Sequence, residues 1–132
     1  MAAKKRAAPR PKGQRTSKQV TGDAGEQAAA DLFTAQGFTL LARNHRTRRG
    51  EVDLIAVKGP LLVFVEVRAR ASDRFGPAEG TVDARKQARV VWAARDWLAK
   101  NGGDQREIRF DVVAVVGGAV RHVPGAFDAG GW

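Results

Sequence analysis

Two acidic residues, Asp53 and Glu66, stand in neighbouring segments whose remaining side chains are largely apolar. Residues 51–57 alternate, a Lys-Gly-Pro break follows, and residues 61–68 alternate again, which predicts a β-hairpin. If the turn centres between Gly59 and Pro60, Asp53 faces Glu66 on one face of the sheet. Directly opposed residues have Cβ atoms about 5 Å apart.

Two carboxylates at that separation repel each other, and their Val, Leu, Ile and Phe neighbours make an uncompensated charge costly. A divalent cation would relieve the repulsion, and carboxylates completed by water and phosphate are what Mg²⁺ prefers. Alternatively, an arginine such as Arg68 or Arg70 neutralises the pair. The same register sets Glu51 opposite Arg68, so such a partner is at hand. A slip of one residue would put the carboxylates on opposite faces and remove the argument.

The surrounding pattern predicts helices and strands in the order αβββαββ. The fold class is therefore α/β, with a mixed central sheet flanked by helices. The expected helices cover residues 22–36 and 82–100, and the expected strands cover residues 38–43, 51–57, 61–68, 108–116 and 119–123. Residues 44–50 and 69–80 are expected to be loops, and residues 124–132 a loose end. The apolar stripe of the second helix is expected to follow Ala84, Ala88, Val91, then Ala94 or Arg95, and Leu98.

Charge is concentrated at the N-terminus. The chain has 23 Lys and Arg against 14 Asp and Glu, a net charge of +9, and residues 1–20 contain no acidic residue. We expect residues 1–20 to be a disordered basic tail, which either binds a polyanion such as nucleic acid or is a solvated arm. Residues 21–132 are expected to form one domain.

Other classes of protein are excluded by composition. The chain has no cysteine, which excludes disulfides, thiolate metal sites and cysteine nucleophiles. It has no apolar run of about 18 residues and no signal-peptide pattern, so we expect a cytoplasmic protein without a membrane segment. The two histidines, His45 and His122, are isolated and are not expected to bind metal.

Residues 50–55 (GEVDLI) and 62–70 (LVFVEVRAR) resemble the motifs of the PD-(D/E)xK nuclease-like superfamily. More closely, residues 22–128 resemble the YraN-like uncharacterised bacterial proteins. Further matches are Gly25-Glu26, Arg43-Asn44, Phe75-Gly76, Lys86-Gln87, Arg109–Val112 and Ala126-Phe127. The resemblance implies a restriction-endonuclease-like αβββαβ core. Kinship with archaeal Holliday-junction resolvases further implies a homodimer that cleaves branched or structured DNA with Mg²⁺ or Mn²⁺.

The resemblance also assigns roles to residues. Asp53 and Glu66 correspond to the metal ligands, and Glu26 to an acid that resolvase-like members carry on the first helix. Glu26 is otherwise explained as a carboxylate favoured near a helix N-terminus. Arg68 stands where the superfamily usually has lysine, and arginine does not deprotonate water at neutral pH. Lys86 either supplies the missing lysine or is an exposed helix residue, and the cation itself can lower the pKa of the attacking water.

Five arginines lie just before or just after the predicted hairpin: Arg43, Arg46, Arg48, Arg49 and Arg70. We expect these side chains to contact phosphates, or else to belong to a solvated loop. Asp111 lies in an apolar strand and is expected to be structural. Trp92 and Trp97 are expected to be core or interface residues more than base-stacking platforms.

Three classes of function remain. The first is a metal-dependent nuclease, the second a non-catalytic nucleic-acid-binding module, and the third an adaptor for another protein. The facing carboxylates favour the nuclease, while arginine in place of lysine favours the second class. A steep dependence of DNA binding on salt would argue against the adaptor.

Overall fold

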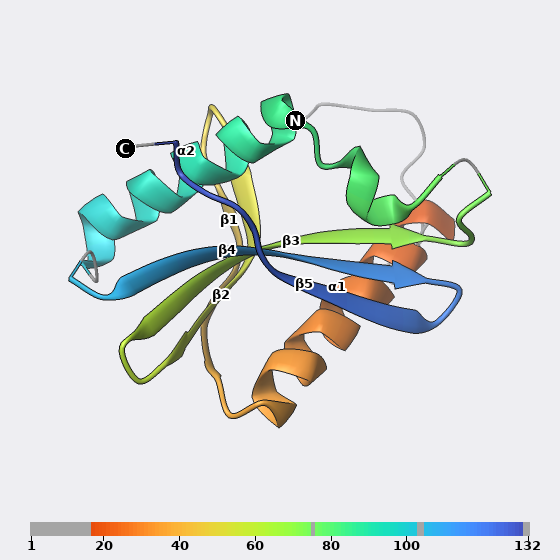
Figure 1. Ribbon diagram of the computed structural model, residues 1–132, viewed down its shortest axis with the longest axis horizontal. Helices are drawn as coiled ribbons and strands as arrows, with labels where there is room; N and C mark the ends of the chain where they lie inside the picture. The colour runs from red at the N-terminus through yellow and green to blue at the C-terminus, as the bar shows by residue number, and fades with distance from the viewer. Residues whose placement is uncertain (1–16, 75, 103–104, 131–132) are drawn as a thin grey trace, which may run out of the picture.

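The computed structural model describes residues 17–74, 76–102 and 105–130 and contains one five-stranded sheet with the strand order β1-β2-β3-β4-β5. The strands are β1 (Thr39–Arg46), β2 (Glu51–Lys58), β3 (Leu61–Arg70), β4 (Glu107–Val116) and β5 (Ala119–Phe127). β3 and β4 run parallel, and the other neighbouring pairs are antiparallel. The helices are α1 (Ser17–Ala35), the short 3-10 helix η1 (Ala78–Thr81) and α2 (Ala84–Asn101). The predicted mixed sheet and αβββαβ core are confirmed (Figure 1).

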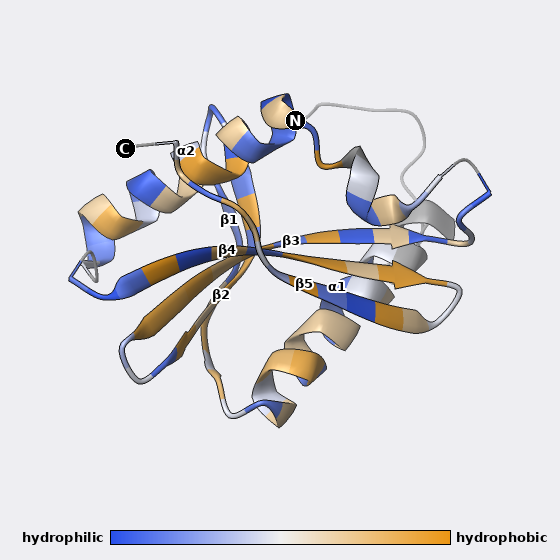
Figure 2. Cartoon of the chain, in the orientation of Figure 1, coloured by the Kyte–Doolittle hydropathy of each residue, from blue (hydrophilic) through white to orange (hydrophobic). Residues whose placement is uncertain are grey.

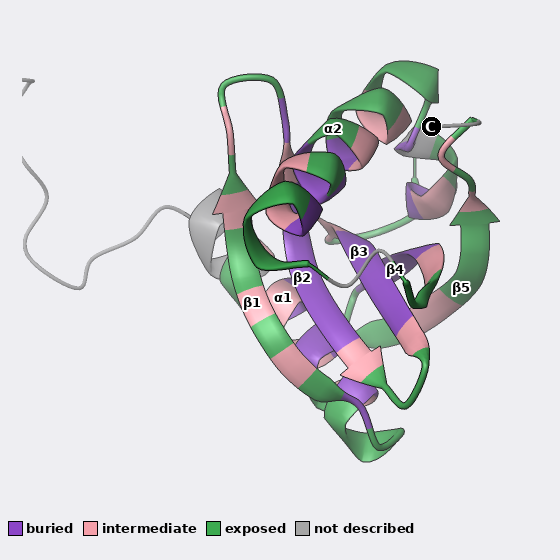
Figure 3. Ribbon diagram, turned by 90° about the vertical axis from the view of Figure 1, so that its left-hand side faces the viewer, coloured by how far each residue is buried: buried purple, intermediate pink, exposed green. Residues whose placement is uncertain are grey.

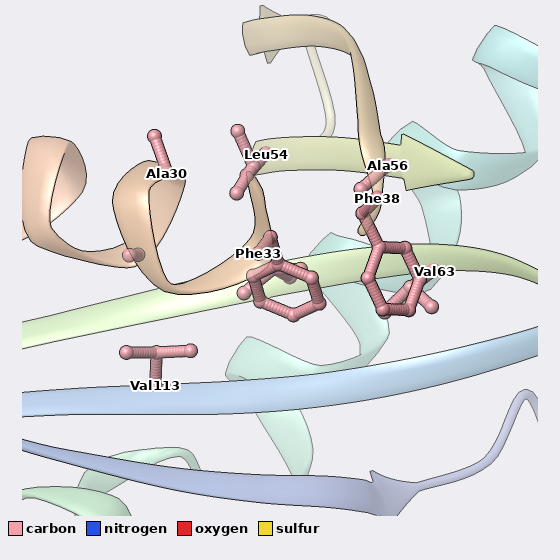
Figure 4. Close-up of a cluster of buried hydrophobic side chains, with 9 residues drawn as sticks. Ala30, Phe33, Phe38, Leu54, Ala56, Val63 and Val113 are labelled. Atoms are coloured by element: carbon pink, nitrogen blue, oxygen red, sulfur yellow. The ribbon is translucent and has the colours of Figure 1, made fainter. Parts of the chain in front are cut away.

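The helices cover opposite faces of the sheet, because neighbouring residues of a strand point to opposite sides. Ala30 and Phe33 of α1 pack on one face, against side chains that include Leu54, Val63 and Val113 (Figure 4). On the other face, residues of α2 such as Val90, Ala93 and Leu98 pack against Ile55, Phe64 and Phe110. Burial on both faces explains why β4 reads as a nearly continuous apolar run. The strands β2, β3 and β4 are hydrophobic and buried at their centres, whereas β1 and β5 form exposed edges (Figures 2 and 3).

Several element boundaries differ from the sequence-based expectation. β1 continues to Arg46, so residues 44–46 are strand and not loop, and a tight turn remains in which Thr47 N donates to Gly50 O at 2.8 Å. β5 extends to Phe127, whose ring stacks on Phe110 with centroids 5.2 Å apart. In both strands, pairing with an inner neighbour stabilises residues whose own pattern is polar. α1 begins at Ser17, and residues 1–16 of the predicted tail lie outside the described residues.

The buried face of α2 agrees with the expected one in its second half and differs in its first. Ala94 and Leu98 are buried and Val91 is half-buried, as expected, whereas Ala84 and Ala88 are exposed. Val90 and Ala93 are buried in addition, and the outward face is rich in arginine, with Arg85, Arg89 and Arg95 exposed. Within the described residues, neither helix is long and apolar enough to span a membrane.

The first turn of α2 is capped by Asp83, whose Oδ1 accepts a hydrogen bond from Lys86 N at 3.0 Å. We expect Asp83→Ala to lower the free energy of unfolding by about 1 kcal/mol, because the exposed helix end loses this acceptor. Urea unfolding of wild type, Asp83→Ala and Asp83→Asn would measure the effect. Asparagine caps helices as well as aspartate does, so equal losses in both variants would contradict a capping role.

Candidate active site

The β2–β3 hairpin has the register that the sequence predicts. The paired residues run from Lys58↔Leu61 to Leu54↔Val65, which leaves Asp53 and Glu66 one step beyond the last pair. Both side chains are buried, each residue being 8% exposed. Asp53 Oδ2 accepts a hydrogen bond from Val67 N at 2.7 Å, so a side chain of β2 bonds the backbone of β3 just beyond the Leu54–Val65 pair.

Burial and mutual repulsion change the pKa values of the Asp53 and Glu66 carboxyls. Burial and then the charge of Asp53 raise the pKa of Glu66 to about 8, although Arg68 and Lys86 act to lower it. Burial also raises the pKa of Asp53 to about 6, while the Val67 N–H acts in the opposite direction. The carboxyls are hydrogen-bonded to each other. Near neutral pH, in the absence of a cation, the pair therefore retains a proton.

Arg68 forms an ion pair with Glu66, with Nη1 and Oε2 3.7 Å apart. Its charge acts to lower the pKa of Glu66, but burial and the charge of Asp53 outweigh it, so that pKa stays raised. An arginine therefore does lie beside the pair, as the alternative expected, and its charge offsets that of Glu66 only in part.

Two further predicted residues, from the two helices, lie close enough to act on the pair. The charge of Glu26 in α1 raises the pKa of Asp53, and Glu26 Oε1 accepts from Asn44 Nδ2 at 3.2 Å. Lys86 in the first turn of α2 lowers the pKa of Glu66. Of the five predicted catalytic residues, Asp53, Glu66 and Arg68 thus lie together on the hairpin, and Glu26 and Lys86 act on the two carboxyls through their charge from the two helices.

Arg121, which does not belong to the Asp53–Glu66 pair, holds the segment that precedes α2. Arg121 of β5 donates to both Asp73 oxygens at 2.9 and 2.8 Å, and to both Glu79 oxygens at 2.6 and 3.0 Å. These bonds lower the pKa of both acids. The network ties Asp73 and Glu79 to β5 and so helps to place the start of α2.

The sequence reasoning gave no site role to Glu51 or Gly50. Glu51, which was expected to face Arg68, raises the pKa of Asp53 and forms an ion pair with Arg46, with Nε and Oε1 3.3 Å apart. Gly50 touches the backbone of α2, because a Cβ built on it would lie 2.0 Å from the carbonyl oxygen of Arg89. Glycine directly before an alternating strand was the available signal for such a close approach.

The predicted phosphate-binding arginines lie on β1, on the turn after it and at the end of β3. Four of them are exposed, and Arg70 is half-buried; the four are Arg43, Arg46, Arg48 and Arg49. Arg43 Nη1 donates to Gln27 Oε1 at 3.0 Å, and the Arg49 guanidinium lies 4.5 Å from the centroid of the Trp92 ring. Arg43 thus lies in an edge strand, as expected, and Arg46 lies in the same strand, which corrects the loop expected there.

Asp111 has the structural role that was expected of it. It is fully buried and accepts from Arg109 Nε and Nη2, both at 2.8 Å, and from Gly125 N at 2.9 Å. The His122 ring lies 2.7 Å from its second oxygen, and His45 is paired with Asp96 at 2.9 Å. Both histidines thus hold carboxylates of the framework, away from the Asp53–Glu66 pair.

The donor set fits a hard divalent cation held by few protein ligands. In the part of the chain that the structure describes, no three His, Cys, Asp or Glu side chains gather closely enough to enclose a metal. Asp53 and Glu66 would therefore supply the protein's oxygens, with water and substrate phosphate completing the shell. That mode of binding is typical of Mg²⁺.

Residues 25–115 match the profile of the uncharacterised protein family UPF0102. The chain belongs to this family. A UPF0102 protein of Anaeromyxobacter dehalogenans is 52% identical over 118 residues, which cover 86% of this chain and 88% of the relative. A relative from Symbiobacterium thermophilum is 50% identical over 94 residues (71% and 80%), and one from Myxococcus xanthus is 44% identical over 113 residues (83% and 90%). UPF0102 is the YraN-like family, so the resemblance noted from the motifs is confirmed.

The raised pKa values predict how the stability of this UPF0102 protein depends on pH. The folded state keeps protons that the unfolded chain releases near pH 4, so stability falls as the pH rises through about 6 and 8. We expect a loss on the order of 5 kcal/mol between pH 5 and pH 8, measured by urea unfolding in a chelator. Glu66→Gln should flatten this slope, and Mg²⁺ should restore stability at pH 8. Equal slopes in wild type and variant would contradict the assignment.

Proposed function

We propose that this UPF0102 protein is a cytoplasmic endonuclease that hydrolyses phosphodiesters of branched or structured DNA with Mg²⁺ or Mn²⁺. The observation that carries the proposal is the buried Asp53–Glu66 pair with Arg68 and Lys86 beside it. Facing buried carboxylates cost stability at neutral pH, and a protein that only bound DNA would gain nothing from them. The basic surface around the β1–β2 turn supports DNA as the substrate.

The proposed mechanism is in-line attack of water on a phosphodiester. Asp53 and Glu66 would hold the cation, which when bound polarises the phosphate and offsets its charge. Burial and the Val67 N–H fix the Asp53 carboxylate, so little reorganisation is needed when substrate arrives. Proton loss from Glu66 makes the second carboxylate available to the cation, and metal binding is accordingly favoured at higher pH.

Arg68 and Lys86 would act on the phosphate and on the attacking water. Both are cations whose charge reaches Glu66, so they lie on the side of the site where negative charge develops. Arg68 is suited to a phosphate fork. Lys86 would take the role of the usual lysine, which orients or activates the attacking water.

A second candidate function is a nucleic-acid-binding module without catalysis. The observation that favours it is Arg68 in the place of the usual lysine, with the nearest lysine supplied by another element, α2. Such a module would bind the same DNA, and its affinity would depend as steeply on salt, but it would release no cleavage product.

A cleavage assay distinguishes these functions. We expect wild type to cut a labelled four-way junction or flap in Mg²⁺ or Mn²⁺, and not in chelator, with linear duplex and single strand as comparisons. Asp53→Asn should be inactive, while Asp128→Asn, which changes an exposed aspartate, should cut as wild type does. No cutting together with steeply salt-dependent binding would favour the non-catalytic module. DNA binding that does not change with salt concentration would favour an adaptor for another protein.

A further inference from the structure

Trp92 is an exposed tryptophan set among guanidinium groups. It is 38% exposed, and the guanidinium carbons of Arg49 and Arg95 lie 4.5 and 5.8 Å from its ring centroid. Trp97, on the same helix, is half-buried and packs edge-on against Phe64 with centroids 6.1 Å apart. The fold therefore uses one of these indoles in its core and leaves the other at the surface.

Trp92 lies on a basic stripe of α2 that begins beside the candidate active site. Arg85, Arg89 and Trp92 follow at spacings of four and three residues, which places them on one face of the helix, and all three are exposed. The outward side of α2 is exposed in Figure 3, and its buried side faces the sheet. Lys86, whose charge reaches Glu66, is six residues before Trp92, or about 9 Å along the helix axis.

The chemistry of this cluster suits a nucleobase. A base stacks on an indole or on a guanidinium plane, and the same guanidinium groups attract the adjoining phosphates. A depression of about 200 Å³ is lined by Trp92, Arg95 and Asp96. Asp96 is engaged by His45 at 2.9 Å and by Lys100 at 3.2 Å, so the acidic member of the cluster is already paired. The surface offered to a ligand is thus aromatic and positive.

We propose that Trp92, with Arg49 and Arg95, stacks an unpaired nucleobase of the DNA strand beside the candidate cleavage site. In a duplex the faces of the bases are hidden by their stacked neighbours, so this contact needs a single-stranded segment. The inference rests on the proposed function and narrows its substrate class to DNA with unpaired nucleotides near the cut. Linear blunt duplex would then lack one of the contacts that position the strand.

Binding measured in chelator tests the stacking separately from cleavage. Fluorescence anisotropy with a labelled oligo-dT strand, a flapped duplex and a blunt duplex should show that Trp92→Ala weakens the first two about tenfold. Binding to blunt duplex should stay unchanged, and Trp92→Phe should keep most of the affinity because it keeps an aromatic face. Val120→Ala, which trims another exposed apolar side chain (41%) on β5, is the matched control and should bind as wild type.

Tryptophan fluorescence measures directly whether oligo-dT contacts the Trp92 indole. Oligo-dT should quench the emission of wild type and of Trp97→Phe, and the quenching should be lost in Trp92→Phe. Equal weakening of all three DNAs by Trp92→Ala would overturn the proposal, as would quenching that persists in Trp92→Phe. Tighter binding of oligo-U than of oligo-dT would also overturn it, in favour of RNA. If wild type cleaves structured DNA while Trp92→Ala binds every DNA normally, the stacking fails and the proposed nuclease function stands.

Discussion

Glu66→Gln is expected to lower metal-dependent cleavage of DNA by about 10²- to 10³-fold while leaving the protein folded. Glutamine keeps the size of the side chain and its capacity to hydrogen-bond Asp53, but it removes the negative charge that a cation needs. Because that charge is buried beside Asp53, its loss also removes a repulsion. The variant should therefore be at least as stable as wild type at pH 8, so inactivity could not be attributed to unfolding.

Cleavage of the preferred DNA substrate and calorimetric binding of Mn²⁺ should be measured on the same preparations. Glu107→Gln is the matched control, since Glu107 is an exposed glutamate at the start of β4, beside Leu61 and at the other end of the hairpin. Glu107→Gln should cut DNA and bind Mn²⁺ as wild type does. If Glu66→Gln kept full activity, Glu66 would have no part in the mechanism, even if a metal bound elsewhere on the protein.

The hairpin could be predicted in detail because several local signals agree on it. Alternation fixes which side chains share a face, and the Lys-Gly-Pro turn fixes the register, so a residue such as Leu54 has one partner, Val65. The facing of Asp53 and Glu66 follows from that arithmetic. The positions of Glu26 and Lys86 relative to the pair do not, because they depend on how two helices pack across a sheet. For those residues the family resemblance was the effective guide.

The first half of the buried face of α2 was predicted wrongly for a physical reason. Alanine is apolar but small, so a stripe through Ala84 and Ala88 buries little area, whereas the stripe through Val90 and Leu98 buries more. Trp92 then turns outward. Its exposure could not be read from residue type, since tryptophan is more often buried than exposed.

Gly50→Ala is expected to destabilise the protein by about 3 kcal/mol or more, an effect large for a single methyl group. A Cβ at this position would lie 2.0 Å from the carbonyl oxygen of Arg89 and 2.7 Å from its carbonyl carbon. Both atoms belong to the backbone of α2, so no side-chain rotation relieves the overlap. Either the turn before β2 or the helix has to move.

Gly22→Ala is the matched control, because a Cβ there meets nothing within 4 Å. Alanine at this helical position should stabilise the fold by about 0.5–1 kcal/mol, so the same substitution should have opposite signs at the two sites. Urea unfolding would measure both. Unchanged stability in Gly50→Ala would mean that α2 does not approach the hairpin as closely as the structure places it.

The contact at Gly50 also connects stability to activity. Gly50 immediately precedes Glu51 and lies three residues before Asp53, and Arg89 is one helical turn after Lys86. A shift at this contact would therefore change the separation between the carboxylates of the hairpin and the lysine of α2. If the Gly50→Ala protein remains folded at low temperature, we expect its cleavage of DNA to fall while Mn²⁺ binding by Asp53 and Glu66 persists. The reason is that the register of the hairpin is set by its own turn and not by Gly50. Loss of Mn²⁺ binding from a folded variant would instead show that α2 holds the carboxylates in place.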